Sequence, residues 1–466
     1  MGLVAPTSAA QQLDSVLAPG TTVAEVVSTS DSTQQYAVFA PAQFDPDSTW
    51  PVLFAMDPRG RALVPLRLLE PAAAEHGYII ISSHNTLSDG PPEPNIAAIT
   101  ALLADMQHVS SIDTSRLYLV GFSGTARIAW DVGFQLGDRV AGVVGFGAAL
   151  PWPLSVLRAM LDQSGPPFVF FGGAGFLDFN YWELSLLNAQ LDQLGMRHRI
   201  EFYDGPHAWP PEVQFTRAVE WLELQAIHSG LKTDESDWVP ELLQKRTDEA
   251  RAVRADKRLL DALTLYESIA EDFAGLQDVS LAAAAAEDLA QTQSVRQARQ
   301  RLDQLYNAYL EYTGWLGEYL ENVRTSEHPP TLSEAKERLW IDRLLRHAAG
   351  EDSLGGPGAQ RMLETTFVHT AFYGPRAQFD SGRPDRALAM LEVAHAIKPT
   401  NGSTCYGLAR ARAQVGDPAG AVEALECVVA AWGTDPDRLE RDPNLAPLVG
   451  SDEFDWLLRE LREKQR

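Results

Sequence analysis

Three side chains, each placed just after an apolar run, have the types that nucleophilic catalysis requires. Ser123 lies in the stretch Gly-Phe-Ser-Gly-Thr at 121–125, Asp178 follows a later apolar run, and His207 follows the next. A serine hydroxyl is a weak nucleophile until a base takes its proton, and the base needs a carboxylate that orients its ring. The chain order of nucleophile, acid and base therefore predicts a triad in which Ser123 attacks a carbonyl carbon.

Other interpretations of these residues stay open. Thr125 stands where the pattern Gly-x-Ser-x-Gly has its last glycine, and an ordinary strand-to-helix turn has a similar composition. His207 is alternatively a solvated loop histidine, and Asp178 a turn residue or cap of the helix expected at 181–194. Asp204 is a second candidate acid, but it lies only three residues from His207, so we expect Asp178 to be the acid behind the ring.

The negative charge that develops on the substrate oxygen needs backbone N–H groups directed at it. Gly124, directly after the nucleophile, is expected to provide one of them. The second is expected from the loop after the strand at 51–56, where the sequence is Asp-Pro-Arg-Gly. Arg59 is the expected donor in this loop; a shift by one position would place Pro58 there, which has no amide hydrogen.

The apolar runs predict an α/β fold with a mostly parallel sheet covered by helices. Runs such as Tyr-Ile-Ile-Ile-Ser at 78–82 are apolar without alternation, as in strands that helices bury on both faces. We expect strands at 22–27, 35–40, 52–56, 78–82, 117–122, 140–146, 168–172 and 200–203. We expect helices between them at 63–77, 95–110, 126–136, 154–163, 181–194 and 211–229.

The first half of the chain resembles the α/β-hydrolase superfamily, and within it the dienelactone-hydrolase, feruloyl-esterase and poly(3-hydroxybutyrate)-depolymerase-like esterases. The resemblance is carried by residues 35–41, 50–54, 121–124, 178–181 and 205–210 and covers about residues 20–228. It implies an α/β-hydrolase sandwich that hydrolyses a carboxylic ester, or less often a peptide bond. It also implies that no metal and no organic cofactor takes part.

Aromatic side chains are frequent in the loops expected at the carboxyl edge of the sheet, where substrate would bind. The candidate substrate-binding rings are Trp152, Phe176, Phe179, Tyr181, Trp182 and Trp209. Rings in such loops also pack beneath their own loop, so this alternative stays open for each of them. The loop at 83–94 follows the fourth strand on the same edge and is a candidate specificity loop.

The chain changes character near residue 231, since lysine is absent before Lys232 and strands are not predicted beyond it. Gly-Arg-Pro-Asp-Arg-Ala at 382–387 recurs as Gly-Asp-Pro-Ala-Gly-Ala at 416–421, an offset of 34 residues. This offset is the period of tetratricopeptide repeats, which the segment resembles. We expect long or paired helices at 260–273 and 294–319, and a closing helix at 454–461. The expected divisions are a tail at 1–20, a catalytic domain at 21–230, a linker at 231–240 and an all-α domain at 241–466.

Composition limits the partners. The formal net charge is −25, which argues against nucleic acid and anionic membranes, and no apolar run is long enough to span a membrane. The expected partners are a small or polymeric ester substrate and, for the helical half, a peptide or protein; a rigid spacer or a lid is the alternative. Cys405 and Cys427 are expected to be reduced, buried thiols. The start of the chain lacks signal-peptide features, and the resemblance tilts the expected location slightly toward the periplasm or outside.

Three functions are therefore considered. The leading one is a serine esterase that works through an acyl-enzyme on Ser123. The second is a serine peptidase or amidase on the same triad. The third is an inactive hydrolase-fold protein that acts through its helical half.

Overall fold

The computed structural model describes residues 13–233, 237–350, 355–432 and 435–464, and its contacts divide the chain into two compact units, residues 1–299 and 300–466. Of the expected tail at 1–20, residues 1–12 lie outside the described residues. The rest includes a short helix, α1 (Leu13–Val16), whose Leu13 is buried in the core of the first unit. Residues 234–236 of the expected linker also lie outside the described ranges.

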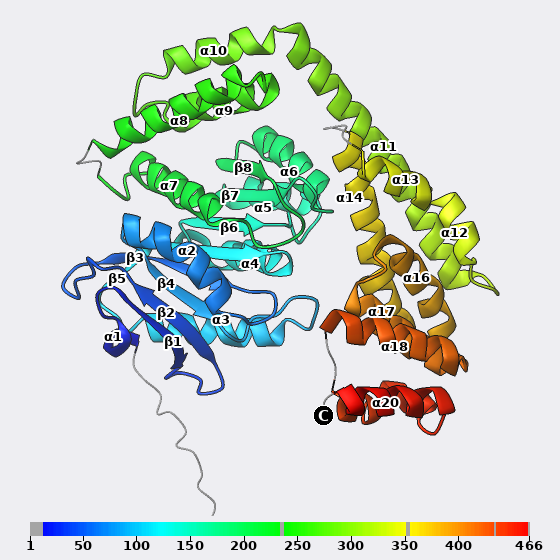
Figure 1. Cartoon of the computed structure of the whole chain (residues 1–466). Helices are drawn as coiled ribbons and strands as arrows, with labels where there is room; N and C mark the ends of the chain where they lie inside the picture. Colours follow the sequence, from blue (N-terminus) through cyan, green and yellow to red (C-terminus); the bar gives the residue numbers. More distant parts are fainter. Residues whose placement is uncertain (1–12, 234–236, 351–354, 433–434, 465–466) are drawn as a thin grey trace, which may run out of the picture. The chain divides into compact units, whose positions relative to one another are not determined.

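An eight-stranded sheet forms the centre of the first unit (Figure 1). Its strand order is β1-β2-β4-β3-β5-β6-β7-β8. β2 pairs antiparallel with both of its neighbours, and the strands from β4 to β8 pair parallel. The strands are β1 (Thr21–Val27), β2 (Gln35–Ala40), β3 (Trp50–Met56), β4 (Ile79–Ser83), β5 (Ile112–Phe122), β6 (Gly142–Phe146), β7 (Val169–Gly175) and β8 (His198–Tyr203). The prediction of a mostly parallel sheet is confirmed.

Helices cover both faces of this sheet, so each strand is buried on two sides. Consecutive residues of β3 show the alternation, because Leu53 and Phe54 belong to two different apolar clusters on opposite faces. The cluster with Leu53 includes side chains of α2 (Leu63–His76) and α7 (Glu212–His228). The other includes side chains of α3 (Glu93–Met106), α4 (Gly124–Leu136), α5 (Leu154–Ser164) and α6 (Tyr181–Leu194). A short 3-10 turn, η1 (Gly137–Arg139), follows α4.

One carboxylate, Glu223 of α7, is completely buried and is balanced by two cations. It forms ion pairs with Arg116 of β5 and Lys232, and the Tyr78 hydroxyl donates to it. Burial alone would raise the pKa of Glu223, but the charges of Arg116 and Lys232 and their hydrogen bonds lower it below its ordinary value. This group therefore ties α7 to the sheet only while Glu223 is ionised.

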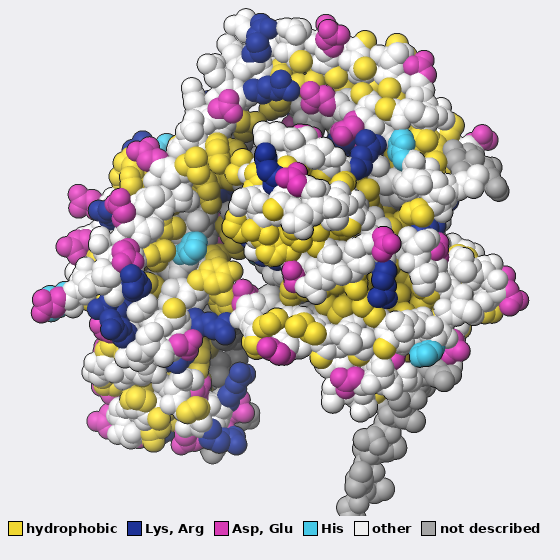
Figure 2. Space-filling view, turned by 180° about the vertical axis from the view of Figure 1, so that it is seen from behind, with side chains coloured by type: hydrophobic (Ala, Val, Ile, Leu, Met, Phe, Trp, Pro, Cys, Tyr) yellow, Lys and Arg dark blue, Asp and Glu magenta, His cyan; other side chains and the backbone are white. Residues whose placement is uncertain are grey.

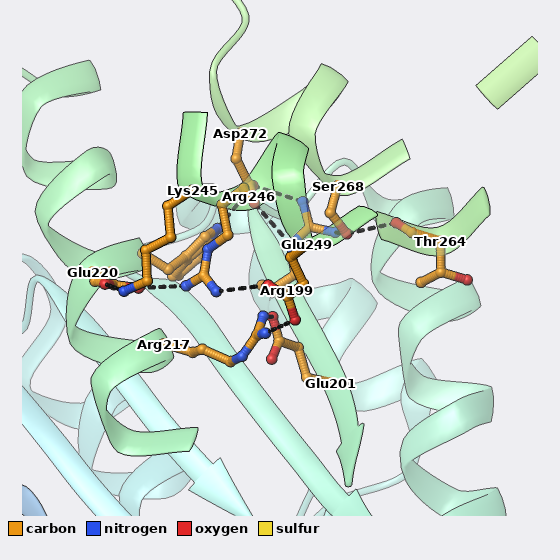
Figure 3. Close-up of polar contacts among 11 residues, drawn as sticks. Arg199, Glu201, Arg217, Glu220, Lys245, Arg246, Glu249, Thr264, Ser268 and Asp272 are labelled. Atoms are coloured by element: carbon orange, nitrogen blue, oxygen red, sulfur yellow. Dashed lines mark hydrogen bonds and ion pairs between the residues drawn. The ribbon is translucent and has the colours of Figure 1, made fainter. Parts of the chain in front are cut away.

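The helices that follow α7 belong to the first unit, which differs from the expected boundary at 231–240. They are α8 (Trp238–Ala255), α9 (Leu259–Asp272) and α10 (Ser280–Ala290). Figure 3 shows the polar side chains that join α8 and α9 to β8 and α7. These are Arg199 of β8, Arg217 and Glu220 of α7, Lys245, Arg246 and Glu249 of α8, and Ser268 and Asp272 of α9.

We call the contacts that join α8 and α9 to β8 and α7 the seam. They explain why the first unit extends past the expected boundary at 231–240. Arg199 donates to a carboxylate oxygen of Asp272 at 2.6 Å and to the Ser268 hydroxyl at 3.0 Å. Arg246 forms ion pairs with Glu220 across the seam and with Glu249 on its own helix. Apolar side chains of α7, α8 and α9 also share one cluster, to which Leu224 contributes from α7. The linker marks a change in composition and not a boundary between packed units.

The described residues of the second unit form helices joined by short connections. The long helix α11 (Gln293–Thr325) begins in the first unit and continues into the second, in agreement with the predicted helix at 294–319. It is followed by α12 (Leu332–Arg338), α13 (Ile341–Ala348), α14 (Gly355–Val368), the π-helical turn η2 (His369–Tyr373), α15 (Gly374–Asp380), α16 (Pro384–Ile397), α17 (Gly402–Val415), α18 (Pro418–Trp432), α19 (Pro436–Glu440), the 3-10 turn η3 (Pro443–Leu448) and α20 (Asp452–Lys464).

The two repeated segments have the geometry that their residues predict. Gly416 ends α17 with φ 83°, a left-handed conformation that glycine adopts without strain, and Pro418 begins α18. Pro384 likewise begins α16. Ala387 and Ala421 are fully buried, so the helices approach closely at both positions.

The cysteines differ from the prediction. Cys405 of α17 and Cys427 of α18 form a disulfide, with their Cα atoms 5.9 Å apart, so the expectation of two reduced thiols is wrong. The reason is that α17 and α18 pack directly on each other, which brings side chains 22 positions apart in sequence together.

The surface carries charges of both signs. On the face drawn in Figure 2, Asp and Glu side chains lie among Lys and Arg side chains, with apolar side chains between them. The net charge of −25 is therefore not gathered into one acidic patch on that face.

Candidate active site

Ser123 lies at the apex of a strained turn between β5 and α4. Its φ is 54° and its ψ −126°, a conformation that side chains other than glycine rarely adopt. Gly121 makes the turn possible, since a Cβ there would lie 2.4 Å from the carbonyl oxygen of Thr125. The turn lifts the serine hydroxyl above the end of the strand, where a base can reach it.

Thr125 stands in place of the expected glycine, and the turn stays closed because the Thr125 hydroxyl forms hydrogen bonds within it. The side chain is fully buried, its Oγ1 lies 2.6 Å from the carbonyl oxygen of Met56, and it accepts the N–H of Phe122 at 3.0 Å. Met56 ends β3, so Thr125 links the serine turn to the neighbouring strand.

The structure brings Ser123, His207 and Asp178 together in one hydrogen-bonded line. His207 Nε2 lies 2.9 Å from Ser123 Oγ, and His207 Nδ1 lies 2.9 Å from each carboxylate oxygen of Asp178. Asp178 is completely buried, whereas the His207 side chain is 21% exposed. The three residues follow β5, β7 and β8 at the carboxyl ends of parallel strands.

Two further features hold this line in place, and only the ring at position 179 was noted from the sequence. Phe122 and Phe179 flank the His207 ring, with ring centroids 4.8 and 4.3 Å away. Asn180 donates its backbone N–H to Asp178 at 2.8 Å and its side-chain amide to the carbonyl oxygen of Gly147 at 2.7 Å. Asp178 and Asn180 have the spacing of an Asx turn, and this is the sequence signal that could have identified Asn180 as a residue that holds Asp178 in place.

Gly124, the predicted oxyanion donor, directly follows Ser123. It is the first residue of α4, and the first N–H groups of a helix have no acceptors inside the helix. Its position next to the nucleophile also places the positive end of the helix dipole there.

Arg59 does not fit its expected role, and this is a correction to the sequence analysis. Its backbone N–H donates to Asp57 Oδ1 at 2.8 Å, so it is already engaged by a carboxylate. Asp57 is fully buried and also accepts the backbone N–H of Arg61, its guanidinium and the indole N–H of Trp209. Burial alone would raise the pKa of Asp57, but these hydrogen bonds lower it below its ordinary value.

Asp57 therefore has a structural role that the sequence did not indicate. Its carboxylate joins the loop after β3 to the loop that carries His207, through the 2.8 Å bond to Trp209 Nε1.

Phe179 lies against His207, and the other five rings predicted to bind substrate mainly pack against other side chains. Tyr181 and Trp182 are each 8% exposed. Phe176 lies against Tyr181 and Phe202, and Trp152 lies edge-on to Phe134 at 5.5 Å. Trp209 packs on Phe122 and Phe215 and bonds to Asp57. Their alternative role, packing beneath their own loops, is the one these contacts support.

A groove that the sequence did not indicate begins beside the serine turn. It runs between α3 and α4, has a volume of about 420 Å³, and Gly124 belongs to its lining. Its walls come from segments far apart in the chain, so no single motif could have predicted it.

Among the described residues, no three His, Cys, Asp or Glu side chains are grouped so that they could hold a metal ion. No helix within the described ranges is long and apolar enough to cross a membrane.

The tetratricopeptide repeat family matches residues 378–437, and no curated protein matches the chain. Among similar solved structures are FphF, a fluorophosphonate-binding serine hydrolase from Staphylococcus aureus with bound substrate, and FrmB, an S-formylglutathione hydrolase from the same organism. Each is 15% identical; FphF covers 44% of this chain and 99% of its own (TM-score 0.38), and FrmB 44% and 98% (0.37). The feruloyl esterase module of Clostridium thermocellum, complexed with sinapinate, is 14% identical over 46% of this chain and 93% of its own (0.33).

The strand order, the helices on both faces and the serine turn after β5 define an α/β-hydrolase fold for the first unit. The described residues of the second unit form helices, and its residues 378–437 match the tetratricopeptide repeat family. A peptide or protein partner for it stays a prediction.

Proposed function

We propose that the first unit is a serine hydrolase that cleaves carboxylic esters, with Ser123 as nucleophile, His207 as base and Asp178 as orienting acid. The observation that supports this most strongly is the line of contacts from Ser123 Oγ through the imidazole to Asp178, each 2.9 Å long. A general base must lie within about 2.6–3.2 Å of the atom whose proton it takes, and His207 Nε2 lies 2.9 Å from Ser123 Oγ.

In the proposed acylation step, Ser123 Oγ forms a bond to the ester carbonyl carbon while its proton passes to His207 Nε2. The N–H of Gly124 donates to the oxyanion of the tetrahedral intermediate. The bond between carbon and the alcohol oxygen then breaks, and the alcohol leaves with the proton from His207. Asp178 keeps Nδ1 protonated and stabilises the imidazolium.

In the proposed deacylation step, a water molecule attacks the acyl group on Ser123 and gives its proton to His207. The bond to Ser123 breaks, the carboxylic acid leaves, and the serine regains its proton. The proposed cycle uses no metal and no organic cofactor.

A fluorophosphonate probe tests for a live nucleophile, because it forms a covalent bond only with an activated serine. We expect labelling of the native protein and none of Ser123→Ala. Ser155→Ala, which changes an exposed serine on α5, is the matched control and should label normally. An unlabelled native protein would favour the inactive alternative.

A substrate panel separates esters from amides. We expect p-nitrophenyl esters to be turned over and the matching p-nitroanilides to be turned over far more slowly. Ser123→Ala should lower kcat by about 10⁴-fold or more. Preference for the anilides would instead favour the peptidase or amidase alternative.

A further inference from the structure

An apolar groove lies between α3 and α4 and begins beside the serine turn. Its volume of about 420 Å³ lies in the range of pockets that bury a small organic ligand, about 300–1,000 Å³. Two of its apolar side chains stay exposed, Leu87 at 45% and Ile96 at 59%. The apolar lining includes Leu87, Ile96, Ile99, Leu103, Ile128 and Val132.

Most polar side chains that line the groove have partners within the protein. Asn95 accepts the N–H of Leu87 and donates to its carbonyl oxygen, which holds the loop after β4 against α3. Arg127 donates to the carbonyl oxygen of Leu150 and forms an ion pair with Glu183. Ser88 and Gln135 donate to Asp89 and Asp131, respectively. A polar ligand would have to break these bonds, whereas an apolar chain leaves them intact.

The inner end of the groove lies beside the serine turn. Gly124 lines it and is the residue next to Ser123. Ser88 lies so close above Gly124 that a Cβ there would approach the Ser88 Cβ to 2.4 Å. The loop that carries Ser88 is also fixed to the loop after β3, because Ser88 N–H donates to the carbonyl oxygen of Pro58 at 2.9 Å.

The strand order decides which part of an ester faces the groove. β6, β7 and β8 lie on one side of β5, and Asp178 and His207 follow β7 and β8. β3 and β4 lie on the other side, and the loop after β4 leads into α3 and the groove. The leaving oxygen must lie at His207 Nε2 to receive its proton. The acyl substituent of the same carbonyl carbon then has room on the other side of β5, where the loop after β4 leads into α3.

We infer that the groove between α3 and α4 binds an unbranched, medium-length acyl chain of the ester substrate. This inference rests on the proposed function, because it assigns the acyl side of the same site. The groove walls are aliphatic along α3 and α4, so each added methylene group leaves water when it enters.

The first test is a chain-length series of p-nitrophenyl esters from acetyl to octanoyl. We expect kcat/KM to rise with each added methylene group, up to about fourfold per group. Val132→Trp should fill the groove, lower kcat/KM for the octanoyl ester by at least tenfold, and change that for the acetyl ester by less than twofold. Val156→Trp, at a 41% exposed position on α5, is the matched control and should keep the native profile. A profile that does not rise with chain length, or that Val132→Trp leaves unchanged, would overturn the inference while acetyl ester turnover still supports the proposed function.

The second test does not need turnover. Octanoate binding to Ser123→Ala protein, measured by calorimetry, should be detected and should be lost when Val132→Trp is added. Absence of octanoate binding would overturn the inference even if no ester is hydrolysed. Circular dichroism of each variant separates loss of the groove from loss of folding.

Discussion

Asp57 connects two loops of the candidate active site, and Asp57→Asn should loosen both. Its Oδ1 accepts the backbone N–H groups of Arg59 and Arg61 and the Arg61 Nε–H, at 2.8 to 3.1 Å. Its Oδ2 accepts Arg61 Nη2–H at 2.9 Å and Trp209 Nε1–H at 2.8 Å. An asparagine whose side-chain oxygen takes the Oδ1 position keeps the three hydrogen bonds made there. Its NH₂ group then takes the Oδ2 position, so Arg61 Nη2–H and Trp209 Nε1–H face a donor and lose their acceptor.

The expected cost follows from these contacts. A hydrogen bond to a charged group contributes about 1.5–3 kcal/mol, and Trp209 loses such a bond inside the protein. The Arg61 side chain is 48% exposed and can turn to water, so its lost ion pair adds at most about 1 kcal/mol. We therefore expect the free energy of unfolding to fall by about 2–4 kcal/mol. Trp209→Phe removes a single donor and should cost less.

The assay is urea unfolding followed by tryptophan fluorescence, with ester turnover measured on the same samples. Because Trp209 lies two residues from His207, we also expect kcat/KM to fall by more than tenfold; a displacement of about 1 Å costs up to about 100-fold. Asp47→Asn, at an exposed position, is the control and should change neither value. If the free energy of unfolding of Asp57→Asn stays within about 0.5 kcal/mol of the native value, the carboxylate does not hold these loops and the reasoning is refuted.

Three further predictions concern other parts of the chain. Thr125→Val should lower the free energy of unfolding by about 1–3 kcal/mol, because the carbonyl oxygen of Met56 loses its donor, whereas Thr125→Ser should stay close to native in the same urea assay. Reduction of the disulfide between Cys405 and Cys427 should destabilise the second unit by about 3 kcal/mol, which thermal unfolding with and without reductant would measure; an unchanged transition would contradict this. Because the pKa of Glu223 is lowered in the folded chain, its contribution to stability should be present above about pH 4.5 and lost as the pH falls further. Glu223→Gln should flatten that acid limb in unfolding measured from pH 7 to pH 3, and an equally steep limb in the variant would exclude Glu223 as its source.

The sheet and the order of the three candidate catalytic residues could be predicted because both depend on local pattern. Unbroken apolar runs mark strands that helices bury on both faces, and Ser123, Asp178 and His207 each follow such a run. Parallel strands end at the same edge, which is why residues 84 positions apart lie within 2.9 Å.

The oxyanion loop could not be predicted, because a motif does not show whether a backbone N–H already donates to another group of the protein. The place of Arg59 in the loop predicts an oxyanion donor, but the carboxylate of Asp57, two residues earlier, accepts the Arg59 N–H in a local turn. The aromatic side chains at 176–182 could not be assigned for a related reason. Composition shows that a loop contains aromatic residues, but it does not show which way each ring faces.

The groove and the unit boundary depend on contacts between distant segments. Residues near 95–103 and 124–136 form one recess only after the sheet has assembled. Arg199 and Asp272 are 73 positions apart, and the composition around residue 231 carries no sign of their ion pair.

The seam between β8, α7, α8 and α9 has a consequence for dividing the chain. A protein cut short at residue 230 would present Arg199 and Glu220 to water without their partners on α8 and α9, together with the apolar side chains of α7, and Arg217 would keep only Glu201. A single protease nick between residues 233 and 237 would instead leave two polypeptides that stay associated without a covalent link. The compact unit is thus longer than the sheet and the helices that cover it, because α8, α9 and α10 also belong to it.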